Sequence, residues 1–234
     1  GYALTLVARD LARLEELAAT LHAEHGTACE VISADLADPA ALAGVEERVR
    51  QAEDLSLLVN CAGFGTTGRF AELDIDAEEA EVRVNVIATM RLARAALPGM
   101  IARGQGGLIN VSSIAAFQPG PLNATYSATK SFVISFSEAL HEELRGTGVT
   151  VQALCPGFTR TEFQHRAGWE PSAVPGFAWS EAPDVVRVSL RALKRGDAVC
   201  IPGVHNKLLA ATSGAAPRGL VRRVSGIVSR RAVR

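Results

Sequence analysis

Short apolar runs separated by segments with helical spacing constrain the fold of this chain more than any other feature of its sequence. A continuous apolar run of this kind suits a strand that is buried on both faces of a parallel sheet. The expected strands are residues 3–8, 28–34, 55–59, 108–111, 149–154 and 198–201. The chain has 234 residues, enough to bury a substantial core as one domain.

Helix signals lie between the apolar runs. Asp10 precedes apolar residues at helical spacing, and Gly26 ends that pattern, so a helix is expected between them. Asp38 and Pro39 supply an N-cap and a first-turn proline for the next helix. That helix is expected to extend over residues 39–51, and further long helices are expected over residues 76–100 and 180–195.

The composition excludes several classes of function. The net charge is −1 and the sequence pI is about 6.6, so no overall field attracts nucleic acid. The chain has no run of about 18 apolar residues, so no membrane span is expected. The four cysteines lack a CxxC spacing, which argues against a disulfide framework or a metal site and favours a reducing compartment such as the cytoplasm.

Tyr126 and Lys130 are the most chemically suggestive pair in the sequence. They are four residues apart at the start of a helical pattern, so both side chains share one helix face. A nearby ammonium stabilises phenolate, and lowering a phenol pKa from about 10 to about 7 requires roughly 4 kcal/mol. Lys130 together with a cationic oxidised nicotinamide is expected to supply that stabilisation. The Ser113 hydroxyl, on a preceding loop, would then hydrogen-bond the substrate oxygen.

The order of these residues resembles the short-chain dehydrogenase/reductase family. The likeness rests on Ser113 and on the YxxxK pattern of Tyr126–Lys130, together with the segment 60–63 (Asn-Cys-Ala-Gly), Asn85, and Pro156-Gly157. It extends from residue 1 to about residue 202. The resemblance implies an α/β fold with a Rossmann-like, doubly wound parallel sheet in a single domain.

The resemblance also implies the catalytic roles. Ser113 polarises the substrate oxygen, Tyr126 transfers the proton, and Lys130 holds the cofactor ribose. Asn85 is expected to hold a proton-relay water on its backbone carbonyl, served by a local irregularity of its helix. The family's spacing between serine and tyrosine selects Ser113 rather than Ser112.

Further residues are implied as cofactor contacts. An acidic residue and its apolar neighbour contact the adenine, a loop after a strand approaches the ribose, and a Pro-Gly turn flanks the nicotinamide. The corresponding residues here are Asp35 and Leu36 for the adenine, Asn60, Ala62 and Gly63 for the ribose, and Pro156, Gly157, Phe158 and Thr159 for the nicotinamide, with Thr161 as an alternative to Thr159.

Arg9 favours NADP (NADPH) over NAD. Dinucleotide folds place an acidic residue after the second strand to bind the ribose hydroxyls, whereas an arginine nearby accommodates a 2′-phosphate. Here Ala8 fills the acidic position and Arg9 follows it. Asp10 either caps the next helix or touches the ribose, and the helical spacing after it favours the cap.

The N-terminus departs from the family pattern. Gly1 and Tyr2 run directly into the first expected strand, with no glycine-rich phosphate loop before them. The resemblance implies that a first strand and a TGxxxGxG turn belong upstream, so the chain is expected to be N-terminally incomplete, with both missing. Because that strand is central in the 3-2-1-4-5-6 order, strands 3–8 and 55–59 would lose their shared neighbour.

Two C-terminal segments remain open. Residues 162–179 contain Phe163, Trp169, Phe177 and Trp179, which suggests a lid over an apolar substrate, with an ordinary packed loop as the alternative. The chain is expected to divide into a domain over 1–205 and a basic amphipathic tail over 206–234. The tail carries seven cations and no acid, so it suits contact with an anionic membrane surface, a partner subunit or solvent.

The sequence therefore predicts an NADP-dependent oxidoreductase that interconverts a ketone or aldehyde and an alcohol. A non-catalytic dinucleotide sensor or scaffold on the same fold is the alternative. The small-molecule substrate is not identified by the sequence. A homo-oligomer is expected because the family commonly pairs through its long helices.

Overall fold

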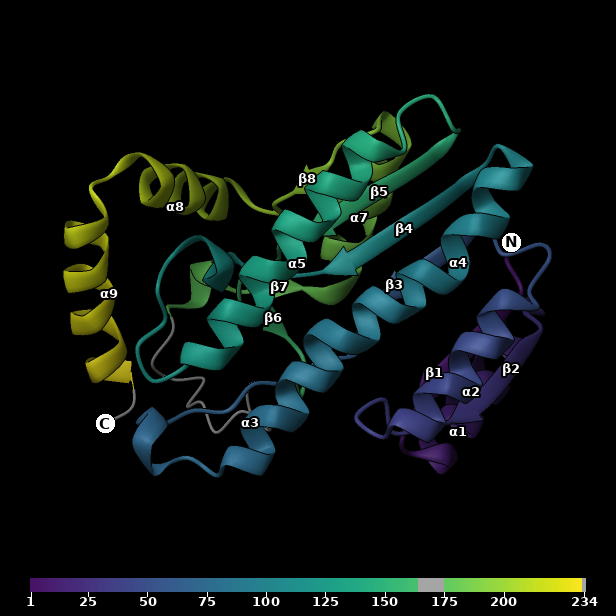
Figure 1. Cartoon of the computed structure of the whole chain (residues 1–234), viewed down its shortest axis with the longest axis horizontal. Coiled ribbons are helices and arrows are strands. Elements are labelled where there is room, and N and C mark those ends of the chain that lie inside the picture. The colour runs from purple at the N-terminus through teal and green to yellow at the C-terminus, as the bar shows by residue number, and fades with distance from the viewer. Residues whose placement is uncertain (164–174, 233–234) are drawn as a thin grey trace.

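The computed structural model describes residues 1–163 and 175–232, in which strands and helices alternate along the chain (Figure 1). The strands are β1 (Leu4–Ala8), β2 (Cys29–Ser33), β3 (Leu57–Asn60), β4 (Gly106–Val111), β5 (Val149–Leu154), β6 (Thr159–Arg160), β7 (Ser180–Glu181) and β8 (Val199–Cys200). The α-helices are α1 (Leu11–His25), α2 (Pro39–Arg50), α3 (Ile75–Val82), α4 (Thr89–Arg103), α5 (Ala124–Glu143), α7 (Ala182–Arg195), α8 (Val204–Ala215) and α9 (Arg218–Ala232). Each expected strand is present within one or two residues of its predicted bounds.

All strand pairs in the described chain are parallel, and the strands form three separate sheets. The main sheet has the order β3-β4-β5-β8, β1 pairs with β2, and the short strands β6 and β7 pair with each other. Strands β1 and β3 are not hydrogen-bonded to each other, and each is the edge of its sheet. The sequence anticipates this separation of strands 3–8 and 55–59.

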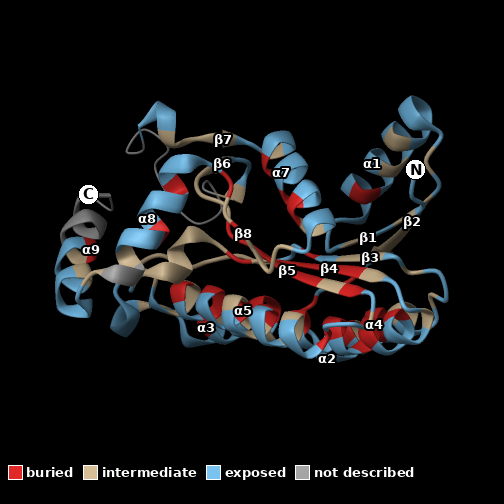
Figure 2. Cartoon of the chain, turned by 90° about the horizontal axis from the view of Figure 1, so that it is seen from above, coloured by how far each residue is buried: buried red, intermediate tan, exposed pale blue. Residues whose placement is uncertain are grey.

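Helices cover both faces of the strands (Figure 2). Helices α2, α3, α4 and α5 lie on one side, and α1 and α7 lie on the other. This layering confirms the prediction of a Rossmann-like, doubly wound α/β domain.

The helix boundaries follow the capping signals of the sequence. The Asp10 side chain accepts a hydrogen bond from the Arg13 amide, and Gly26 ends α1 in the left-handed conformation with φ of 64°. The Asp38 side chain accepts from the amides of residues 40 and 41, with Pro39 in the first turn of α2. Asp10 is therefore the N-cap of α1, as the helical spacing predicts.

The long helix expected over residues 76–100 contains an irregular segment. α3 and α4 are joined by a π-helix, Arg83–Ala88, in which backbone hydrogen bonds connect residues five apart instead of four. Asn85 lies inside this π-helix and is buried. The irregularity expected at Asn85 is thus present.

Buried polar side chains link the main sheet to the helices on its two faces. The Asn60 amide donates to Asn110 Oδ1 at 2.9 Å, and the Asn110 amide donates to Ser137 Oγ on α5 at 2.9 Å. On the opposite face the Ser189 hydroxyl of α7 donates to Gln152 Oε1 at 2.6 Å. Because these groups are buried and paired, they fix the positions of β3, β4 and β5 relative to the helices.

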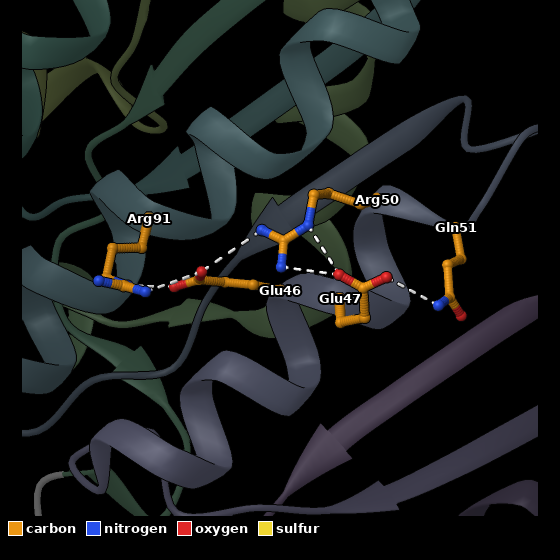
Figure 3. A network of polar contacts seen from close by, with 5 residues as sticks. All are labelled: Glu46, Glu47, Arg50, Gln51 and Arg91. Carbon is orange, nitrogen blue, oxygen red and sulfur yellow. Dashed lines mark hydrogen bonds and ion pairs between the residues drawn. The ribbon is translucent and has the colours of Figure 1, made fainter.

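The β1–β2 unit is attached to the rest of the molecule through α2 and α4. The buried carboxylate of Glu46 on α2 is ion-paired with Arg91 on α4 and lies 3.6 Å from a guanidinium nitrogen of Arg50 (Figure 3). Glu47 holds the other end of this network by accepting from Arg50 and Gln51. An apolar cluster that includes Leu36, Leu42, Val45, Val84 and Leu92 packs beside it.

Of the tail expected over residues 206–234, the described residues up to Ala232 form most of α8 and all of α9. α8 packs against the short 3₁₀ helix Ile114–Phe117, and Asn206 at its start is buried and donates to the Pro202 carbonyl at 2.7 Å. In α9, the Ser225 hydroxyl donates to the Pro119 carbonyl at 2.5 Å. Within the described residues no helix is both long enough and apolar enough to cross a bilayer.

Candidate active site

Helix α5 places Tyr126 and Lys130 on one face, beside the carboxyl end of β4. The Lys130 ammonium lies 5.6 Å from the centroid of the Tyr126 ring and donates to the Val111 carbonyl at 2.9 Å. Lys130 is only 5% exposed, so its charge is held in a largely water-free setting. The predicted pair therefore faces one space, as their i, i+4 spacing requires.

Ser113 belongs to the same space. It is the N-cap of the 3₁₀ helix Ile114–Phe117, where its hydroxyl oxygen accepts from the Ala115 amide at 3.1 Å. Its side chain is also hydrogen-bonded with Tyr126. The neighbouring Ser112 is buried, and its hydroxyl donates to the Lys130 carbonyl at 2.7 Å, so it has a structural partner.

The acid–base properties of the pair are dominated by burial. Burial raises the pKa of Tyr126 to about 12, against the opposing effect of the hydrogen bond with Ser113. Burial likewise lowers the pKa of Lys130 to about 8. In the protein alone, loss of hydration disfavours both charged forms, and the acidification expected from Lys130 together with an oxidised nicotinamide stays a prediction. Tyr126 is a protonated phenol at neutral pH.

Asn85 uses its side chain to hold the loop that follows β3. Its amide donates to the Phe64 carbonyl at 2.9 Å and to Thr129 Oγ1 at 3.1 Å, while its Oδ1 accepts from the Phe64 amide at 3.2 Å. Its backbone carbonyl accepts from the Thr89 hydroxyl at 3.0 Å. The water-binding role of that carbonyl stays a prediction.

The loop after β3 approaches the pair so closely that only glycine fits at two positions. A Cβ on Gly63 would lie 2.9 Å from Asn85 Oδ1 and 3.3 Å from the Lys130 ammonium. A Cβ on Gly65 would lie 2.8 Å from the Tyr126 ring. Gly63 thus lies next to Asn85 and Lys130, whereas Asn60 is buried in the amide network with Asn110 and Ala62 is exposed.

The Pro-Gly segment follows β5, beside the same edge of the sheet. Pro156 accepts from the Ile114 amide at 3.0 Å, which ties this segment to the turn carrying Ser113. A Cβ on Gly157 would collide with the Asn206 amide at 2.5 Å. The Phe158 and Trp179 rings lie tilted against each other with their centroids 5.7 Å apart, and Thr159 begins β6.

The residues predicted to contact the adenosine half lie apart from this cluster, in the β1–β2 unit. Arg9 and Asp35 are exposed at the carboxyl ends of β1 and β2. Leu36 is buried within the apolar cluster under α2, which accounts for its apolar character independently of any ligand. The Asp35 carboxylate accepts from the Ala37 amide at 2.9 Å.

The lid predicted over residues 162–179 is described only at its ends. Residues 164–174, including Trp169, lie outside the described part of the chain. Of the remaining aromatics, Phe163 lies 5.6 Å from the Tyr126 ring and Phe177 is exposed. An aromatic side chain is thus next to the candidate site.

Sequence reasoning missed two buried acids on α3. Glu78 and Glu81 are 4% and 0% exposed and face Thr66 and Thr125, next to Tyr126. A glutamate on a helix is ordinarily a solvated residue, so its identity alone gives no signal. The available signal is spacing, because Glu81 lies one helical turn before Asn85.

Comparisons with known proteins agree with this geometry. Residues 1–170 match the family described as short chain dehydrogenase. A short-chain dehydrogenase from Sphingobium yanoikuyae, solved in complex with NADPH, is 37% identical with a TM-score of 0.85, covering 95% of this chain and 86% of that one. A bulky-bulky ketone specific alcohol dehydrogenase from Comamonas testosteroni is 33% identical with a TM-score of 0.78, covering 92% of this chain and 84% of that one.

A curated relative extends the range of substrates among similar proteins. The very-long-chain 3-oxoacyl-CoA reductase of Anas platyrhynchos is 29% identical over 171 residues, which is 69% of this chain and 53% of the relative. The match thus spans about half the length of that relative.

Proposed function

The chain belongs to the short-chain dehydrogenase family, and from this premise we propose that it is an NADP-dependent oxidoreductase that reduces a ketone or aldehyde to an alcohol. The observation that carries the proposal is the meeting of three groups: the hydrogen-bonded pair Ser113 and Tyr126, and the buried Lys130 ammonium 5.6 Å from the phenol ring. A half-buried hydroxyl pair next to a cation is suited to stabilise charge that develops on a substrate oxygen.

The residues of this chain fit a nicotinamide dinucleotide. Gly63 lets the backbone lie against Asn85 and Lys130 without a Cβ, and the Lys130 ammonium keeps donors beyond the one used by Val111. The turn at Pro156 and Gly157 lies across the same edge of the sheet, where open α/β sheets bind ligands. Lys130 would hold the ribose, the segment 156–159 the nicotinamide, and Arg9 and Asp35 the adenosine half.

Proton chemistry is assigned to the chain's own residues. A bound reduced nicotinamide would supply the hydride for reduction of the substrate carbonyl. The protonated Tyr126 phenol donates its proton to the substrate oxygen, while the Ser113 hydroxyl donates a hydrogen bond to the same oxygen. Lys130 stabilises the phenolate left behind. The raised pKa of Tyr126, about 12, keeps the phenol protonated at neutral pH, which is the form that reduction requires.

An NADPH-oxidation screen over apolar ketones, 3-oxoacyl thioesters and aldehydes tests this proposal. We expect turnover with an apolar carbonyl, because Phe163 lies against Tyr126 and Phe158 against Trp179. Binding of NADPH without turnover of any carbonyl, unchanged by Tyr126→Phe, would instead support a non-catalytic sensor or scaffold.

The NADP preference rests on Arg9. Its guanidinium is exposed at the end of β1 and makes no ion pair with any residue in 1–163 or 175–232. A guanidinium with no ion pair to the described residues suits the 2′-phosphate of NADPH in this place, whereas Asp10 is engaged as the α1 cap.

We also propose that the protein self-associates through the face formed by α4 and α5. Ile87 at the end of the preceding π-helix, Met90 on α4 and Phe132 on α5 are exposed apolar residues, and Phe132 stacks on Phe136 at 5.6 Å. Apolar side chains gathered on long helices suit an isologous dimer contact. Light scattering of Met90→Glu and Phe132→Glu variants should show a smaller particle than the parent protein.

The tail is proposed to contact an anionic membrane surface. Arg218, Arg222 and Arg223 are exposed on α9, next to Leu220 and Val224, which are 56% and 52% exposed. Cations and apolar side chains together favour an anionic lipid interface. Sedimentation with phosphatidylserine vesicles should depend on these residues. Equal sedimentation of an Arg218, Arg222 and Arg223 to Gln variant would overturn this assignment.

A further inference from the structure

The buried carboxyl groups of Glu78 and Glu81 are hydrogen-bonded to the loop after β3, against which Tyr126 packs. Glu81 Oε2 accepts from the Thr66 amide at 2.9 Å and contacts the Thr66 hydroxyl at 3.1 Å. Glu78 accepts from the same Thr66 hydroxyl and from the Thr125 hydroxyl, which is one residue before Tyr126. The acids therefore connect the loop after β3 to the start of α5.

The loop formed by residues 63–66 is hydrogen-bonded at two points to one continuous helical segment, made of α3 and the π-helix that follows it. Asn85 binds Phe64 through both its amide and its carbonyl oxygen, and Glu81 binds Thr66. Positions 81 and 85 are one turn apart, and positions 64 and 66 are two apart in the loop, so the two contacts are adjacent. Between them, Gly65 is pressed against the Tyr126 ring.

Counting protons assigns a state to Glu81. The Thr66 hydroxyl has one proton, and it lies within hydrogen-bonding distance of both Glu78 Oε1 and Glu81 Oε2. When that proton is donated to Glu78, the contact with Glu81 is filled only if Glu81 carries a proton itself. The second oxygen of Glu81 is buried and has no partner among the described residues, which a carboxylate tolerates poorly.

We propose that Glu81 is a positioning residue for the Tyr126 site: it holds the 63–66 loop against the phenol through Thr66, and its ionisation places a negative charge beside that phenol. The proposal rests on the proposed reductase function for its kinetic consequence. The titratable groups around Glu81 are Glu78 on its own helix and Tyr126 and Lys130 on α5.

Charge on Glu81 acts on the phenol. It raises the pKa of Tyr126, as the interaction between the two groups indicates, so the phenol becomes a weaker proton donor. Burial, more than the nearby Glu78, raises the pKa of Glu81 to about 7, so this effect falls in the neutral range, whereas the hydrogen bonds from Thr66 oppose that rise.

Two measurements test the loop contact without relying on catalysis. Infrared difference spectra of ¹³C-glutamate-labelled protein should show a protonated carboxyl band at about pH 6 that disappears through neutral pH and is absent in Glu81→Gln. Amide hydrogen exchange at Thr66 should accelerate at least about tenfold in Glu81→Ala. The matched control is Glu79→Gln, an exposed acid on the same helix that pairs with Arg83. No such band, or unchanged Thr66 exchange, would overturn the proposal.

A third measurement tests the consequence for the reaction. The pH profile of kcat/KM for carbonyl reduction should fall through about pH 7 in the parent protein and in Glu79→Gln, and this fall should be missing in Glu81→Gln. A fall near pH 8 that persists in Glu81→Gln belongs to Lys130. A profile of Glu81→Gln that coincides with the parent refutes the role of Glu81 while leaving the reductase intact. Absence of reduction refutes the proposed function, and the spectroscopic tests still report on the loop.

Discussion

The β1–β2 unit and the four-stranded sheet differ in what holds them in place. In the main sheet, β4 is hydrogen-bonded on both sides, and buried amides such as Asn60 and Asn110 fix the strands to the helices. Among the described residues, β1–β2 shares no strand pairing with that sheet. It is attached by the packing of α2 on α4, by the ion pair of Glu46 with Arg91, and by the exposed pair of Arg13 with Glu162.

This difference separates two tasks. Ser113, Tyr126, Lys130 and Asn85 all lie in the region fixed by backbone ladders and buried amides, where positions are defined most tightly. Arg9 and Asp35 lie in the unit that is attached by side chains. We therefore expect changes in the main sheet region to alter chemistry and changes in the β1–β2 unit to alter cofactor binding.

Replacing the phenol is the strongest test of this separation. Tyr126→Phe should lower kcat/KM for carbonyl reduction by about 10²- to 10⁴-fold, because the proton donor is removed. NADPH affinity, measured by fluorescence titration, should change little. A variant that keeps most of its turnover with a good substrate would show that Tyr126 is not the proton donor.

The pH dependence of stability should locate Glu81 in the tightly held region. The folded pKa of Glu81, about 7, exceeds the ordinary glutamate value of 4.5, so between these values the folded state binds more protons than the unfolded state. The free energy of unfolding therefore falls as pH rises through this window, by on the order of 1–3 kcal/mol. Urea unfolding of Glu81→Gln should lack this fall. Parallel curves for both proteins would contradict the assignment.

Removing the free guanidinium of the β1–β2 unit should affect cofactor choice alone. Arg9→Ala should weaken NADPH binding by about tenfold, since a charge-assisted contact with the 2′-phosphate is lost, and should leave NADH binding nearly unchanged. Isothermal titration with both dinucleotides measures this ratio. Arg13→Ala is a useful comparison because its exposed partner is Glu162. An equal loss for NADPH and NADH would place the 2′-phosphate elsewhere.

Loosening the attachment of the β1–β2 unit should give the smallest effect. Arg91→Ala leaves the Glu46 carboxylate buried with only the longer contact to Arg50. Hydrogen exchange should then rise in β1, β2 and α2 and remain unchanged in β4 and β5, with cofactor affinity lowered a few-fold. Arg83→Ala, which removes an exposed ion pair, is the control. Uniform acceleration across both sheets would show that the two regions unfold together.

The sequence predicted the fold well because its signals were local. Apolar runs marked the strands, and Asp10, Gly26, Asp38 and Pro39 marked helix ends through contacts with their own neighbours. Such contacts depend on a few adjacent residues and are readable without tertiary structure. The family resemblance then supplied the order of strands, which local signals do not contain.

The site was predictable only where residue type and spacing carried the chemistry. Tyr126, Lys130 and Ser113 met as expected, because a helical turn and a strand end fix their directions. The raised pKa of Tyr126 in the protein alone could not be read from the sequence, since burial depends on everything packed around the phenol; the lowering expected with Lys130 and a bound oxidised nicotinamide stays a prediction. Glu81 was missed for the same reason: a surface and a buried glutamate look alike in a sequence.

The π-helix at Arg83–Ala88 sets how far α3 is rotated about the helix axis relative to α4. An α-helix turns about 100° per residue, so deleting one residue inside this segment would rotate α3 by about that angle relative to α4. Glu78 and Glu81 would then point away from the 63–66 loop, while α4 stayed packed on the sheet. The extra residue in the π-helix thus lets α3 face the loop while α4 faces the sheet.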